Sequence, residues 1–238
     1  MPLPKITTPT YEIKLLSFDQ PIKYRPFLVK EEKLLLMALE SKDDQTMLSA
    51  IKTIIDNCVE GDKIDVDKLP LFDLEYWFLH LRANSVGSII ELKFPCEKES
   101  CEGLTDISFN INEVELQKDP NHTDIIKITD DISIKMKYPN VKQFAKFESD
   151  DKPTEKMFDL IIDCVESVIQ GDQIFETRLQ TKKELEEFVL SLNASQFKDV
   201  VNFFETMPKL QHLVTYNCVA CNHDNFQVIK GVENFFLF

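Results

Sequence analysis

The sequence predicts an α+β fold built from two weakly similar halves. Strand-like alternation and helical periodicity follow one another along the chain, a similar order of segments recurs after residue 118, and each half contains a close pair of cysteines. With 238 residues, 43% of them hydrophobic, and 5 glycines, the chain can build packed cores. We therefore expect one large domain or two small ones.

The first half opens with a predicted β-hairpin and a helix. Residues 11–16 and 22–27 are strand-like, and the turn-forming residues 19–21 lie between them. From residue 28 to about residue 41, apolar and charged side chains are mixed in the way that is typical of a surface helix. These segments predict a hairpin followed directly by a helix.

Two more helices are predicted in the first half. Apolar residues recur at steps of three and four from Met47 to Val59, behind two acidic residues that suit a helix N-terminus. A third helix opens at Leu69-Pro70-Leu71, because proline is favoured in a first helical turn. Its apolar stripe is unusually aromatic, and we expect it to lie in the core; a groove that binds a partner is the alternative. The stripe consists of Leu71, Leu74, Trp77, Phe78 and Leu81.

The second half repeats this order. Its predicted elements are a strand at 132–136 and helices near 154–170, 181–192 and 195–206. The apolar run that contains Cys58 resembles the run that contains Cys164, and a Gly-Asp turn follows each. The polar segment 117–122 separates the copies, so the expected domains are residues 1–118 and 119–238. We interpret this pattern as an internal duplication of low sequence identity.

Four cysteines occur as two close pairs, which is the arrangement of a structural zinc site. Cys96 and Cys101 have C-x4-C spacing, and Cys218 and Cys221 have C-x2-C spacing; each pair lies between two strand-like segments. Tetrahedral zinc takes four thiolates, and a pair on each of two turns can supply them. Since one pair lies in each half, we predict a zinc-ribbon-like clasp that joins the halves. His223 in place of one cysteine, disulfides and free thiols are the alternatives.

The composition disfavours several functional classes. The formal charge is −14, with no basic cluster, which disfavours binding to nucleic acid or to an anionic membrane. No apolar stretch is long enough for a bilayer span or a signal peptide, so we expect a cytosol-like compartment. The sequence contains no G-x-S-x-G, no H-E-x-x-H and no phosphate-binding glycine loop, so we do not expect an enzyme.

The segment Y-R-P-F-L-V-K-E-E-K at residues 24–33, behind the opening M-P-L-P, resembles a known family. It is similar to the baseplate hub and hub-assembly proteins of T-even-type contractile-tailed bacteriophages. The resemblance implies a structural or assembly protein of the tail baseplate hub, acting through protein–protein contacts with other baseplate and tail hub proteins. It also implies a place in the virion tail, or in the host cytoplasm during assembly, and multiple copies in a symmetric assembly.

Two basic residues in this segment are candidates for partner binding. Pro26 disfavours a helical conformation at Arg25, so Arg25 and Lys30 lie at a strand-to-helix junction of an otherwise acidic protein. They either bind a neighbouring phage protein or hold acidic groups of their own fold. A zinc-ribbon adaptor or regulatory protein unrelated to virions is the alternative function. Acidic residues flank both cysteine pairs, which disfavours a nucleic-acid-binding ribbon.

Overall fold

The computed structural model describes residues 6–143 and 153–231 and has the predicted α+β class. The chain forms two compact units: Met1–Gln117 together with Lys209–Phe238, and Lys118–Pro208. The second unit begins at Lys118, one residue before the expected start of the second half. The last part of the chain, however, belongs to the first unit, because its strands pair and pack there. None of the described helices is long and apolar enough to span a membrane.

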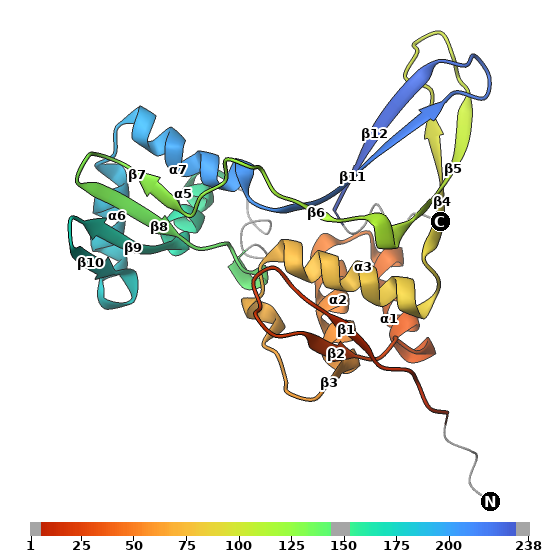
Figure 1. Ribbon diagram of the computed structural model, residues 1–238, viewed down its shortest axis with the longest axis horizontal. Helices are drawn as coiled ribbons and strands as arrows, with labels where there is room; N and C mark the ends of the chain where they lie inside the picture. The colour runs from red at the N-terminus through yellow and green to blue at the C-terminus, as the bar shows by residue number, and fades with distance from the viewer. Residues whose placement is uncertain (1–5, 144–152, 232–238) are drawn as a thin grey trace, which may run out of the picture. The chain divides into compact units, whose positions relative to one another are not determined.

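The first unit contains a small sheet and three α-helices (Figure 1). Its sheet has the order β1-β2-β3, and all its strands are antiparallel. The elements are β1 (Tyr11–Ile13), β2 (Ile22–Tyr24), α1 (Val29–Ser41), α2 (Asp44–Cys58), β3 (Val59–Glu60), the 3-10 turn η1 (Val66–Lys68) and α3 (Leu71–Ser85). The hairpin and the three helices predicted from the sequence are therefore present.

Helix α3 forms the centre of this unit. Trp77 and Phe78 are completely buried, as are Ile54 and Ile55 of α2. A helix that is apolar around most of its circumference is buried on most sides. Four residues of the predicted aromatic stripe accordingly lie in the core, and Leu71 is half-buried.

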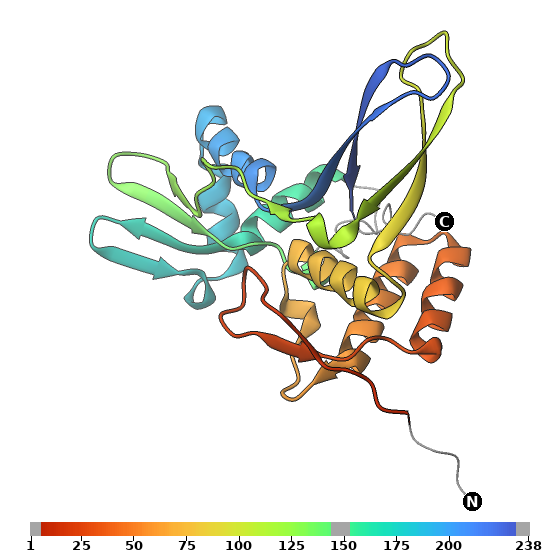
Figure 2. The same cartoon turned by 45° about the vertical axis from the view of Figure 1, so that its right-hand side comes forward.

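Two further β-hairpins of the first unit extend away from its helices, and we call these two hairpins the arm (Figure 2). One consists of β4 (Ile89–Pro95) and β5 (Leu104–Asn110), and the other of β11 (Lys209–Asn217) and β12 (Asp224–Lys230). The 3-10 turn η2 (Ile111–Glu113) and the short strand β6 (Leu116–Gln117) follow β5, and β6 pairs with the start of β11. The arm thus combines strands that lie more than a hundred residues apart in the sequence.

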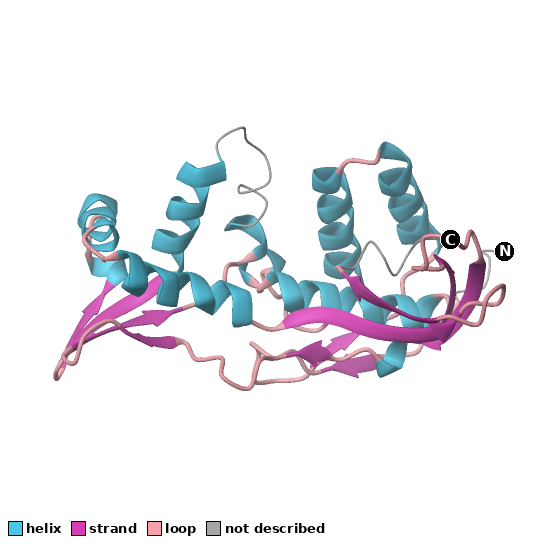
Figure 3. Cartoon of the chain, turned by 90° about the horizontal axis from the view of Figure 1, so that it is seen from above, coloured by secondary structure: helices cyan, strands magenta, loops and turns pink. Residues whose placement is uncertain are grey.

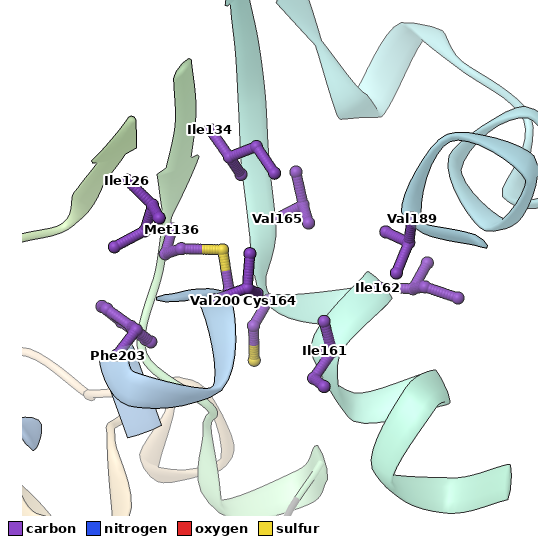
Figure 4. Close-up of a cluster of buried hydrophobic side chains, with 10 residues drawn as sticks. All are labelled: Ile126, Ile134, Met136, Ile161, Ile162, Cys164, Val165, Val189, Val200 and Phe203. Carbon is purple, nitrogen blue, oxygen red and sulfur yellow. The ribbon is translucent and has the colours of Figure 1, made fainter. Parts of the chain in front are cut away.

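The second unit is a four-stranded antiparallel sheet with helices on one face (Figure 3). The strand order is β10-β9-β8-β7. Its elements are β7 (Ile125–Lys127), β8 (Ile132–Met136), α5 (Pro153–Cys164), β9 (Val165–Gln170), β10 (Gln173–Glu176), the 3-10 turn η3 (Thr177–Leu179), α6 (Lys182–Leu190) and α7 (Ala194–Thr206). Figure 4 shows its core, in which side chains of the sheet meet those of the three helices.

The helix predicted over residues 154–170 is shorter in the structure. It ends at Cys164, and Val165–Gln170 forms β9 between β8 and β10. This run is rich in β-branched residues, and Gly171 with a φ of 54° allows a tight turn into the next strand. In the first unit α2 likewise ends at Cys58, and Val59 starts β3. Helical periodicity alone does not reveal such a change of element.

Candidate metal centre

The four paired cysteines lie on the turns at the end of the arm. Cys96 and Cys101 flank the turn between β4 and β5, and Cys218 and Cys221 lie on the turn between β11 and β12. Both turns lie side by side at the far end of the arm (Figures 1 and 2). Both hairpins belong to the first compact unit. The cysteines therefore bring together two distant parts of the sequence within one unit.

The sulfur atoms have the spacing of a tetrahedral thiolate site. The Sγ atoms of Cys96 and Cys221 are 3.7 Å apart, and so are those of Cys101 and Cys218. All four Sγ atoms lie within 4.8 Å of one another. With zinc–sulfur bonds of about 2.3 Å, the edges of a regular S4 tetrahedron are about 3.8 Å long. The donor set and its dimensions thus fit zinc.

Backbone amides donate hydrogen bonds to the sulfur atoms of two of these cysteines. The N–H of Gly103 donates to Cys101 Sγ at 3.4 Å, and that of Ala220 donates to Cys218 Sγ at the same distance. Amide donors at Ala220 and Cys221 lower the pKa of the Cys218 thiol to about 7. The Gly103 amide also lowers the pKa of Cys101, but the neighbouring Cys221 thiol and burial raise it to about 12. Cys218 therefore ionises at a lower pH than Cys101.

Contacts between the hairpins hold the turns in place. The Tyr216 hydroxyl donates to the Pro95 carbonyl at 2.6 Å, and the Tyr216 ring stacks on Phe94 at 5.7 Å. The side chain of Asn225, which is buried, accepts from the Glu97 amide at 2.8 Å. Such contacts behind a ligand set fix the direction of the ligands.

Gly103 is a residue of the site that the sequence analysis missed. A Cβ atom at this position would lie 2.7 Å from Cys218 Sγ and 2.9 Å from the Ala220 side chain. Its φ angle is not positive, so the requirement for glycine is one of space and not of backbone conformation. A glycine two residues behind Cys101, in a chain with only 5 glycines, was the available signal.

Cys58, Cys164 and His223 lie outside the cluster of four sulfur atoms. None of the six cysteines forms a disulfide. Cys58 and Cys164 are buried at the ends of α2 and α5, and burial raises the pKa of Cys58 to about 11 and that of Cys164 to about 12. Among the described residues, the potential metal-binding group contains the four paired cysteines and does not include His223. His223 contributes its carbonyl, which accepts from the Cys218 amide at 2.9 Å.

The two basic candidates at the strand-to-helix junction differ in their surroundings. The Arg25 side chain is 16% exposed and donates to Glu31 Oε1 at 3.1 Å and to the Asn57 carbonyl at 2.8 Å. Glu31 is completely buried and also accepts from the Leu28 amide, at 2.9 Å. Lys30 is 68% exposed and lies 3.3 Å from Glu31 Oε1. Arg25 is thus bound within its own fold, whereas most of the Lys30 side chain faces solvent.

Comparison with known protein families gives a match over nearly the whole chain. Residues 8–237 match the family described as T4 bacteriophage base plate protein. No curated protein and no solved structure matches the chain. The family match spans both compact units and includes all four cysteines of the candidate metal centre. The chain belongs to the family of T4-type bacteriophage baseplate proteins.

Proposed function

We propose that this protein is a structural or assembly protein of the bacteriophage tail baseplate hub, and that it works through protein–protein contacts and not as an enzyme. The family match over residues 8–237 carries the proposal. Apolar side chains exposed on α1 and on the arm offer surfaces for other baseplate proteins; Val29 and Met37 are examples on α1. The comparisons give no support to a zinc-ribbon adaptor unrelated to virions.

The hub role can be tested in a phage that encodes this protein. A nonsense mutation in its gene should give lysates without complete baseplates, and the intact protein supplied in trans should restore them. Mass spectrometry of purified tails then separates a built-in hub subunit from an assembly factor that acts in the host cytoplasm. Complete, contractile tails formed without the protein would contradict the proposal.

We further propose that the four cysteines bind one structural zinc ion, which closes the arm as a zinc-ribbon-like clasp. Four thiolates leave no open coordination position, which is typical of a structural site and not of a catalytic one. The sulfur spacing of 3.7 Å and the two N–H···S hydrogen bonds support the proposal. Because the site links the β4–β5 hairpin to the β11–β12 hairpin, zinc would stabilise the arm directly.

Metal analysis tests this assignment. Protein purified without chelator should contain about one zinc per chain, and cobalt substitution should give thiolate-to-metal absorption. Cys96→Ser and Cys221→Ser should lose the metal, whereas Cys164→Ala, a matched change of a buried cysteine outside the cluster, should retain it. Four freely reacting thiols in freshly purified metal-free protein would contradict the zinc site.

We also propose that the chain arose by internal duplication. In both copies two antiparallel strands precede a helix that ends in a buried cysteine, and a third strand then pairs with the second. The arm would contain the last hairpin of each copy, β4–β5 from the first and β11–β12 from the second. On this interpretation the zinc ion joins the two equivalent hairpins.

Lys30 is the better candidate for a partner contact at the strand-to-helix junction, and we propose that Arg25 acts by fixing the shape of that junction. The exposed side chain of Lys30 supports the first role, and the contacts of Arg25 with Glu31 and Asn57 support the second. Lys30→Ala should leave the melting temperature nearly unchanged and impair hub assembly. Normal assembly by this variant would remove Lys30 from the contact surface.

A further inference from the structure

The four clustered sulfur atoms include two close pairs that each cross from one hairpin of the arm to the other. Cys96 Sγ lies 3.7 Å from Cys221 Sγ, and Cys101 Sγ lies 3.7 Å from Cys218 Sγ. A disulfide bond is about 2.05 Å long, so the two sulfurs of a pair need to approach each other by roughly 1.7 Å to form one. Each turn of the arm thus presents cysteines within bonding reach of the other turn.

The two cross-hairpin pairs differ in their access to solvent. Cys221 is exposed and its partner Cys96 is half-buried, whereas Cys218 is only 2% exposed. The pair of Cys101 and Cys218 also packs against Gly103, where an added Cβ atom would lie 3.3 Å and 2.7 Å from their sulfurs. A dissolved oxidant therefore reaches the pair of Cys96 and Cys221 more easily than the other pair.

We propose that Cys96 and Cys221 are a redox-active pair, which a peroxide converts into a disulfide between the hairpins with release of the zinc ion; this proposal rests on the zinc site proposed above. The Cys221 thiolate attacks one peroxide oxygen, the O–O bond breaks, and a hydroxide ion leaves a sulfenic acid on Cys221. The Cys96 thiolate then attacks the Cys221 sulfur, the S–O bond breaks, and a second hydroxide leaves. The two sulfurs together lose two electrons, and the peroxide gains them.

Access decides which sulfur reacts first, because metal ligands are already thiolates when zinc is bound. The exposed Cys221 is then the site of attack, and Cys96 is the cysteine 3.7 Å away that resolves the sulfenic acid. These two residues are 125 positions apart in the sequence, so their disulfide joins the same distant hairpins as the metal. A disulfide between Cys218 and Cys221 would instead lie within one turn. The arm thus has a covalent way to stay closed in oxidising surroundings that remove zinc.

Oxidation of the zinc-loaded chain with hydrogen peroxide tests the proposal. Peptide mapping without reduction should show the disulfide of Cys96 with Cys221 first, with one zinc released per disulfide and with Cys101 and Cys218 still open to alkylation. Cys96→Ser and Cys101→Ser are a matched pair of variants, because each removes one of the four metal ligands. Cys101→Ser should still form the disulfide of Cys96 with Cys221, whereas disulfide formation at Cys221 should be roughly tenfold slower in Cys96→Ser.

Hydrogen exchange shows whether the disulfide closes the arm. The oxidised, metal-free chain should keep protection of the four arm strands near the turns, and reduction with dithiothreitol should remove it. A first disulfide within one turn would overturn the proposal, and so would equal oxidation rates of the two serine variants or oxidation of Cys221 to a sulfinic acid without a disulfide. The metal content before oxidation tests the zinc site, and the identity of the first disulfide tests the redox-active pair. Failure of one is therefore distinguishable from failure of the other.

Discussion

The two copies of the proposed duplication make the same backbone contact at the end of their second strand. In the first copy the Arg25 amide donates to the Cys58 carbonyl at 2.9 Å, and in the second the Lys137 amide donates to the Cys164 carbonyl at 2.8 Å. In each case the accepting cysteine is the last residue of a helix and is completely buried. The backbone arrangement is therefore common to the copies, although the side chains around it differ.

In the first copy a buried ion pair fixes this junction. Burial raises the pKa of Glu31, but hydrogen bonds from Arg25 and from the Leu28 amide outweigh burial and hold the pKa below its ordinary value. Arg25 also donates to the Pro26 carbonyl at 2.8 Å. The charged groups thus hold the start of α1 close to the end of α2.

In the second copy the residue after Lys137, Tyr138, belongs to an aromatic stack that packs on α7. The His122 ring lies 5.6 Å from that of Tyr138 and 5.1 Å from that of Phe203. Its nitrogens form hydrogen bonds with the hydroxyls of Thr206, at 2.9 Å, and Tyr138, at 3.0 Å. The same backbone contact is thus accompanied by different side-chain chemistry in the two units.

The largest effect is expected when the ion pair of the first copy is broken. Arg25→Ala leaves the Glu31 carboxylate buried without its main partner, so unfolding of the first unit should become easier by about 3–5 kcal/mol. Lys30→Ala removes a mostly exposed cation and should cost less than about 1 kcal/mol. Chemical denaturation of both variants measures the difference. Equal, small effects would show that the pair does not fix the junction.

An intermediate effect is expected where the two hairpins meet. Gly103→Ala places a methyl group against Cys218 Sγ, so zinc affinity should fall about 10- to 100-fold, the range for residues that position metal ligands. Competition with a chromophoric chelator measures the affinity. Glu102→Ala, an exposed neighbour, serves as the control. Unchanged affinity of the Gly103→Ala protein would show that the turns can separate without loss of the site.

The smallest expected effect is a pH dependence confined to the second copy. Burial and the charge of Lys118 lower the pKa of His122, so the folded state favours the neutral ring. The unfolded state then binds more protons, and stability of the second unit should be full above about pH 6.5 and decline as the pH falls through that value. His122→Phe should flatten this dependence in hydrogen exchange followed from pH 7.5 to 5.5. If His122→Phe keeps the same pH dependence of protection, other titratable groups cause it.

Sequence reasoning predicted the α+β class, the first-copy helices and the grouping of four cysteines because each leaves a local signal. Helices repeat apolar residues at fixed steps, and metal ligands on turns occur as close pairs. The assignment of β11 and β12 to the first unit leaves no local signal, because it depends on pairing between distant strands. The early end of α5 was hidden because an apolar run can belong to a buried helix or to a strand.

Side-chain partners were the least predictable part of the site. The role of Gly103 depends on how closely two turns approach each other, and this distance is set by the packing of Phe94, Tyr216 and Asn225 behind the cysteines. Arg25 could have bound Glu31 or an external partner, since its sequence neighbourhood is the same in both cases. Only the burial of Glu31 beneath it distinguishes them.

A metal ion at the four cysteines is proposed to hold together the two hairpins of the arm. Hydrogen exchange of the whole chain with zinc bound and after removal by a chelator tests it most directly. Loss of zinc should remove protection from β4, β5, β11 and β12 near the turns, while α5, α6 and α7 of the second unit keep theirs. Unchanged protection of the arm without metal, or equal loss throughout both units, would contradict the account.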